Sequence, residues 1–218
     1  MSSHVVTTKA EMLSSFPPPV AAMTSEPTLR ELLRVLIHMM ACAQAIKTDI
    51  SPLNYLFLVL SLELYANQTQ EQYPQTPLSP GVTPNYAGAN DAATRAQIKA
   101  SFDYDTMRHE NCAHMNAALV ERFLSLIPFA QRQRYDLDYR TQNPNAPFLD
   151  VFEYFTDQYA ISNEIDRAEN KKQMAQDWHP NDGFDKLVRQ INQGIIYAQY
   201  AEHPIENRDV VDIVVSVA

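Results

Sequence analysis

The stretch TLRELLRVLIHMM, residues 28–40, is the first in the chain to specify a local structure. Thr28 can accept a hydrogen bond from the backbone of a first helical turn, and Glu31 can reach back as its partner in a capping box. The apolar residues that follow form one stripe at helical spacing: Leu29, Leu32, Leu33, Leu36, Ile37 and Met40. The pattern predicts a capped amphipathic helix that packs against a core.

Composition extends this prediction to the whole chain. The 218 residues are 45% hydrophobic, which is enough to build a core, and they include 4 glycines against 14 prolines. Folds with many tight β-turns usually need glycine for positive φ, whereas helices joined by proline-started turns do not. We therefore expect an all-α fold, a helical bundle.

Charge and cysteine content narrow the partners and the compartment. With 17 basic and 26 acidic residues the net charge is −9, so the chain as a whole should not attract phosphate backbones or anionic lipid, although a local basic patch stays open. Two cysteines, Cys42 and Cys112, suit a reducing compartment, and we expect the cytoplasm. The most apolar run, residues 53–64, is too short to cross a membrane, and the first residues carry no targeting signal.

Proline divides the chain into segments. Residues 1–27 are small, polar and proline-rich and predict a flexible arm, in which Pro17–Pro19 are either a polyproline ligand or a plain linker. Ser51 and Pro52 can start a second helix that is apolar nearly all round through residue 64, a run that also fits a buried strand. Residues 66–91 predict an exposed loop, and residues 92–127 a long helix, straight or kinked.

The polar segment 131–147 predicts the boundary between two small helical domains, 28–140 and 141–218. In the second domain, four aromatic residues mark one face of a first helix: Phe148, Phe152, Phe155 and Tyr159. Ser162 or Asn163 can cap the next helix, and Asp182 the third. The third helix has a predicted buried stripe of Phe184, Leu187, Val188, Ile191, Ile195 and Ala198, and the last helix carries Val210, Val211, Ile213, Val214 and Val217. Because no helix-ending signal precedes Ala218, we expect a longer polypeptide or a partner for that helix.

Chemical motifs are sparse. His109, Cys112 and His114 fall on the predicted long helix, but only the first two share a face, and a tetrahedral zinc site needs more ligands than these. The acids Asp103, Asp105, Glu153 and Asp157 fit solvated helix faces better than general acids, and no phosphate loop or nucleophile motif occurs. Three arginines lie beside Tyr135 and Tyr139 in a mixture that could hold a phosphate or stack a base, although acids interleave them: Arg132, Arg134 and Arg140, with Asp136 and Asp138. We expect no enzyme, no cofactor and no metal site.

Trp178, the only tryptophan, lies two residues before Pro180, just ahead of a predicted helix. It could be a platform for stacking a ligand. We favour packing where two helices meet, with the indole N–H donating to a turn carbonyl.

Several weak motifs recur in an order that resembles the Gag-like capsid region of LTR retrotransposons, notably of protist elements. They begin with LFLVLSLELYA before a proline-rich loop and end with HPIENRDVV, and the resemblance covers residues 28–218. The matching positions are Tyr159, Met174, Trp178 with Pro180, Phe184 to Leu187, Ala201, Pro204 with Ile205, and Val210 with Val211. The chain has Ala160 where the family often has glycine, and it lacks the spacing of the retroviral major homology region.

The resemblance implies a retroviral-capsid-like protein of two small helical domains that forms homo-oligomers and assembles into a shell around retroelement RNA. RNA would be held only indirectly, by regions outside this segment. The structural or assembly candidates are Tyr159, Trp178, Pro180, Phe184, Leu187, Ile191, Val210 and Val211. The alternative is a domesticated Gag-derived adaptor or protein-binding module that does not form shells.

Overall fold

The computed structural model describes residues 6–159, 164–201 and 205–217, which contain helices and turns and no strand. The all-α prediction is therefore confirmed. The elements are α1 (Lys9–Ser15), α2 (Leu29–Ala45), η1 (Leu56–Leu58), α3 (Leu62–Thr69), α4 (Ala92–Leu126), α5 (Phe129–Tyr135), η2 (Asp136–Arg140), α6 (Phe148–Tyr159), α7 (Glu164–Met174), η3 (Pro180–Asp182), α8 (Phe184–Tyr200) and α9 (Asn207–Val217). None of these helices is both long and apolar enough to cross a lipid bilayer, within the described ranges.

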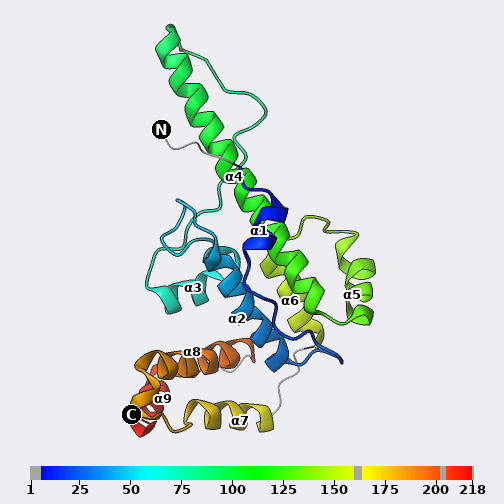
Figure 1. Ribbon diagram of the computed structural model, residues 1–218, viewed down its shortest axis with the longest axis vertical. Helices are drawn as coiled ribbons and strands as arrows, with labels where there is room; N and C mark the ends of the chain where they lie inside the picture. The colour runs from blue at the N-terminus through cyan, green and yellow to red at the C-terminus, as the bar shows by residue number, and fades with distance from the viewer. Residues whose placement is uncertain (1–5, 160–163, 202–204, 218) are drawn as a thin grey trace.

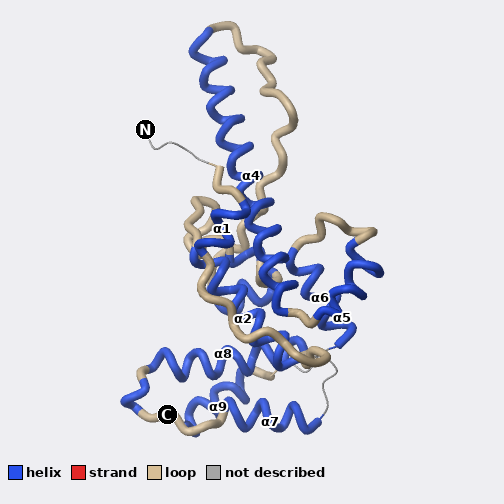
Figure 2. Tube along the Cα trace, turned by 45° about the vertical axis from the view of Figure 1, so that its right-hand side comes forward, coloured by secondary structure: helices blue, strands red, loops and turns tan. Residues whose placement is uncertain are grey.

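Helix α4 is the long helix on which α1, α2 and α6 pack. It begins at the N-cap Asp91, whose Oδ1 accepts a hydrogen bond of 2.8 Å from the backbone of Thr94, and it confirms the predicted long helix. All its fully buried residues lie in its C-terminal half, from Cys112 onward, among α1, α2 and α6. The N-terminal half projects from the body, and the loop after α3 runs beside it (Figures 1 and 2).

Helix α6 is fixed to α4 by aromatic packing. The ring of Phe123 lies 5.7, 5.7 and 5.4 Å from the rings of Phe148, Phe152 and Phe155, in edge-to-face contacts. The side-chain oxygen of Asn116 accepts a hydrogen bond of 2.7 Å from the backbone of Phe148. The aromatic face predicted for α6 is therefore its buried face.

The domain boundary predicted at residue 140 is wrong, because α6 shares its core with α2 and α4. The polar segment does not separate two cores, since Tyr135 is buried within it and stacks at 5.7 Å on Tyr139. A second, smaller core begins only after α6. We call α1–α6 the body and α7–α9 the C-terminal unit.

The predicted flexible arm is also corrected. From residue 6 onward the chain lies against α4, and α1 has a complete capping box between Thr8 and Glu11. Met12, Phe16 and Met23 are buried, and the backbone of Met23 donates a hydrogen bond of 2.9 Å to the carbonyl of Leu126. These three large apolar side chains hold the segment against the body, although its proline-rich composition predicts a flexible chain.

The second predicted helix is broken. Asn54 has a φ of 58°, a conformation that ends a helix, and Ser51 accepts a hydrogen bond of 3.1 Å from the backbone of Leu53. A short 3-10 turn follows, and α3 starts after its own cap, Ser61. The apolar run is central, as expected, but as irregular chain: Tyr55, Leu56, Phe57, Val59 and Leu60 are buried. The exposed loop consequently begins at residue 70 rather than 66.

The C-terminal unit is an antiparallel α7–α8 pair with α9 against it (Figure 2). Its core of Met174, Leu187 and Ile191 is small. Helix α8 also docks on the body, because Ile196, Tyr197 and Ala201 belong to the larger core and Tyr200 lies 5.3 Å from Phe152. The caps predicted for α7, Ser162 and Asn163, lie outside the described residues.

The aromatic contact between α4 and α6 should dominate the stability of the body. We expect Phe123→Ala to lower the free energy of unfolding by about 3–5 kcal/mol, because three ring contacts are lost and a cavity remains. The matched control is Phe129→Ala, at a side chain that is 63% exposed, which should change stability by less than about 0.5 kcal/mol. Urea unfolding followed by circular dichroism measures both. Equal effects of the two variants would contradict the assigned core.

Candidate functional site

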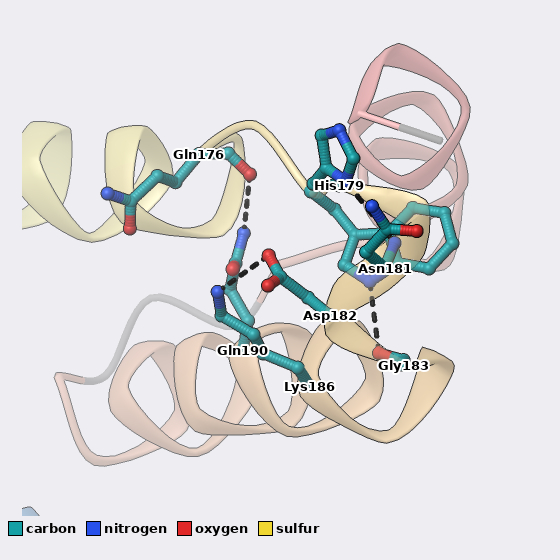
Figure 3. A network of polar contacts seen from close by, with 8 residues as sticks. Gln176, His179, Asn181, Asp182, Gly183, Lys186 and Gln190 are labelled. Carbon is teal, nitrogen blue, oxygen red and sulfur yellow. Dashed lines mark hydrogen bonds and ion pairs between the residues drawn. The ribbon is translucent and has the colours of Figure 1, made fainter.

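The turn between α7 and α8 is held by a network of polar contacts (Figure 3). The indole nitrogen of Trp178 donates a hydrogen bond of 3.0 Å to the carbonyl of Gly183, as predicted. The side-chain amide of Gln190 donates to the carbonyls of Met174 and Gln176, both at 2.9 Å, so it ties α8 to the end of α7. Trp178 is half-buried at the edge of the small core. This geometry favours packing over a free stacking platform.

The cap predicted for α8 is wrong by one residue. Gly183 is the N-cap, with φ 76° and ψ 143°, a region essentially restricted to glycine. Asp182 instead lies in the short η3 turn that begins at Pro180, and its carboxylate accepts a hydrogen bond of 2.8 Å from Lys186. That bond lowers the pKa of Asp182.

The buried stripe predicted for α8 is too wide. Leu187, Ile191 and Ala198 are buried and Ile195 partly so. Phe184 and Val188, in contrast, are 66% and 39% exposed. The neighbouring helices of this small unit cover only part of the apolar surface of α8, which leaves Phe184 and Val188 open to solvent.

A close approach of α7 and α8 was not foreseen from the sequence. Buried Asn170 donates a side-chain hydrogen bond of 3.0 Å to the carbonyl of Gly194, and Met174 packs over the same glycine. A Cβ at position 194 would lie 2.1 Å from Cγ of Met174. The one available signal was a glycine inside an otherwise amphipathic helix.

Helix α9 has no fully buried side chain among those described. Val210, Ile213 and Val214 are half-buried against the small core. Val211 and Val215, one helical turn apart, are 58% and 74% exposed.

Of the predicted assembly candidates, Leu187, Ile191 and Val210 contribute to packing. Tyr159 stacks on Phe155 at 6.1 Å in the body, away from the α7–α8 turn. The chain leaves Phe184 and Val211 exposed, and the side chain of Pro180 lies outside the described residues.

A groove of about 1160 Å³ lies between α2 and the α7–α8 pair. Five cationic side chains from these three helices line it: Arg30, Arg34, Lys172, Lys186 and Arg189. Glu169 is the acid in its lining, and buried His38 has its pKa lowered by burial and then by Arg122. The groove was not predicted, because its cations are far apart in the sequence and each sits on an ordinary polar helix face.

The potential metal ligands of α4 serve the fold instead. Nδ1 of His109 lies 3.0 Å from the carbonyl oxygen of Pro77, and Nδ1 of His114 lies 2.9 Å from that of Thr7. Burial raises the pKa of Cys112 to about 12 and that of Cys42 to about 11, which opposes nucleophilic use of either thiol. Among the residues that the structure describes, no three histidine, cysteine or acidic side chains are grouped to hold a metal ion.

The arginine and tyrosine mixture around residue 135 is likewise engaged in the fold. Arg134 pairs with Asp138 at 3.4 Å, and Arg140 pairs with Asp136 at 3.2 Å. Tyr135 is buried, and burial raises its pKa to about 12. Asp136 and Asp138 therefore offset most of the positive charge of this segment, and the buried ring of Tyr135 is not free to stack a base, which favours the structural interpretation.

The chain has no match among models of protein families, among curated proteins or among solved structures.

The α7–α8 approach requires glycine at position 194. We expect Gly194→Ala to destabilise the C-terminal unit by about 1–3 kcal/mol, because the side chain of Met174 would have to shift from its buried position. In a Met174→Ala background the same substitution should instead stabilise by up to about 1 kcal/mol through helix propensity. Fluorescence of Trp178 during urea unfolding reports both. A Gly194→Ala effect of the same size and sign in both backgrounds would contradict the assigned contact.

The N-cap of α8 makes a separate demand on glycine. Gly183→Ala should lower stability by about 1–3 kcal/mol, because an L-residue is strained at these backbone angles. Asn181→Ala, two residues earlier and exposed, should have a much smaller effect. Thermal unfolding monitored by Trp178 fluorescence measures both, and an unperturbed Gly183→Ala variant would show that the assigned turn is incorrect.

Proposed function

We propose that the chain is a structural subunit that assembles with further copies of itself, a Gag-like capsid protein that forms a shell around retroelement RNA. The observation that carries this proposal is the unpaired apolar surface of α9. Val211 and Val215 form an exposed ridge on a helix that buries none of its described side chains fully. Exposed apolar surface of this kind is typical of an interaction site.

Exposed apolar side chains are concentrated in the C-terminal unit. It holds five of the eleven large hydrophobic residues that are exposed in the described chain, although it is much the smaller part: Ile165, Phe184, Val188, Val211 and Val215. The exposed apolar residues of the body are scattered over α3, the loop, α5 and η2. The C-terminal unit is therefore the better candidate for contacts between copies.

A second copy is the occupant that this surface suits best. An interface around a two-fold axis places the same patch on both sides, so an apolar ridge meets an apolar ridge. One helix face buries little area, but a closed shell repeats the contact many times, and weak contacts then suffice. The all-helical architecture of a larger body and a smaller C-terminal unit supports the same proposal. In this proposal the shell holds its RNA only indirectly, through regions outside this segment, since this chain is acidic overall.

Charging the ridge should abolish assembly without unfolding the chain. We expect Val211→Asp/Val215→Asp to remain monomeric where the unmodified chain forms large particles, because two buried carboxylates would face each other across the contact. The control is Leu78→Asp/Val82→Asp, which adds the same charge at loop side chains that are 87% and 97% exposed. Light scattering and negative-stain microscopy across salt and protein concentration measure assembly, and circular dichroism checks folding.

Monomers of the unmodified chain under every condition would refute self-assembly and favour the adaptor. If the ridge variant forms particles as well as the unmodified chain does, the contact between copies lies elsewhere on the molecule.

A further inference from the structure

The groove between α2 and the α7–α8 pair reverses the charge of the rest of the molecule. The chain has a net charge of −9, yet the groove is lined by five cationic side chains and one carboxylate. Charges separated by more than about 10 Å are largely screened at moderate ionic strength. A ligand inside the groove therefore experiences mainly the local charge, which stays positive when Asp182, the ion-pair partner of Lys186, is counted with the lining.

Three guanidinium groups in the groove are positioned but not neutralised. Arg34 donates a hydrogen bond of 3.1 Å to the carbonyl of Ala21, and Arg189 donates one of 3.2 Å to the carbonyl of Asp185. Arg30 lies over the ring of Tyr197, 5.8 Å from its centre. Within the described residues, none of the three lies at ion-pair distance from a carboxylate.

The two lysines are held only by exposed ion pairs. Lys186 pairs with Asp182 at 2.8 Å, and Lys172 pairs with Glu169 at 4.0 Å, with side chains that are 55% and 82% exposed. Exposed pairs of this kind stabilise weakly, by about 0–1 kcal/mol, so a stronger anion can displace them. All five cations are consequently available to a ligand.

The composition of the groove suits phosphate groups. A planar guanidinium matches the oxygens of a phosphate in two parallel hydrogen bonds. Arg30 and Arg34 are one helical turn apart, on the order of 6 Å between their Cβ atoms, which suits successive phosphates of an extended strand. The side chains of Gln176 and Gln193 also line the groove and could contact sugars and bases.

We propose that the groove between α2 and the α7–α8 pair binds single-stranded RNA through its phosphate backbone. A groove lined by cations can follow the backbone of one strand, as in other proteins that bind single strands without sequence preference. Few bases would be read, so binding should tolerate any sequence. The inference goes beyond the assembly function, because it assigns an RNA contact to this chain itself and does not need a second copy.

Binding should be modest and strongly salt-dependent. Each phosphate neutralised on a single strand contributes about −0.7 to the slope of log K against log salt concentration. Five cations therefore predict a slope of about −3.5, and three would remove about 2 of it.

Fluorescence anisotropy of a short labelled oligouridylate tests the proposal with the whole purified chain, between about 50 and about 200 mM KCl. Arg34→Gln/Lys172→Gln/Arg189→Gln should weaken binding by at least about tenfold at the lower salt concentration and flatten the slope by about 2. The control Lys47→Gln/Lys99→Gln/Arg134→Gln makes the same charge change at exposed cations outside the groove. It should leave the affinity within about twofold of the unmodified chain. Circular dichroism verifies that both variants are folded.

The proposal would be overturned by no RNA binding at the lower salt concentration, or by equal losses in the groove and control variants. A short polyglutamate that displaces the RNA at the same charge concentration would also overturn it, in favour of an acidic protein partner. The assembly variant Val211→Asp/Val215→Asp should bind RNA like the unmodified chain. That result separates the groove from self-assembly, because either function can then fail alone.

Discussion

The burial of Phe123 is the contact on which the body depends. Its ring contacts three phenylalanines of α6, and α4 also contacts α1 and α2. Aromatic side chains bury large areas, and their edge-to-face contacts also fix relative orientation. The packed half of α4 therefore sets the positions of α1, α2 and α6. Because α2 forms one wall of the basic groove, this core also places Arg30 and Arg34.

The C-terminal unit depends on a different constraint, the closeness of α7 and α8. Gly194 allows Met174 to pack directly over the backbone of α8, and Asn170 satisfies a carbonyl there. A core of three buried side chains is small for three helices. The arrangement of α7 and α8 therefore depends largely on these specific contacts. The apolar surface that remains uncovered on α8 and α9 follows from this small size.

Sequence patterns predicted the features that depend on local spacing. The capping box of α2, the length of α4 and the aromatic face of α6 each follow from residues within one helix. Features set by distant neighbours were missed. The arm was assigned as flexible from its prolines, although Met12 and Phe16 pack on α4. The apolar run before α3 fitted a helix until the left-handed Asn54 interrupted it, and that conformation is set by the surrounding turn. The groove combines α2 with α7 and α8, so no single-segment pattern could show it.

Helix α8 connects the two proposed surfaces. Leu187 and Ile191 face the small core, Ile196 and Tyr197 pack into the larger one, Lys186 and Arg189 line the groove, and Phe184 and Val188 stay exposed. The docking of α8 on α2 therefore determines the width of the groove. Tyr197 contributes to the docking of α8 and to the groove. Its ring is buried in the larger core, and the guanidinium of Arg30 lies over the face of that ring. On α8 the groove cations Lys186 and Arg189 lie on a different side from the exposed Phe184 and Val188, so a contact between copies can form while the groove stays open to a strand.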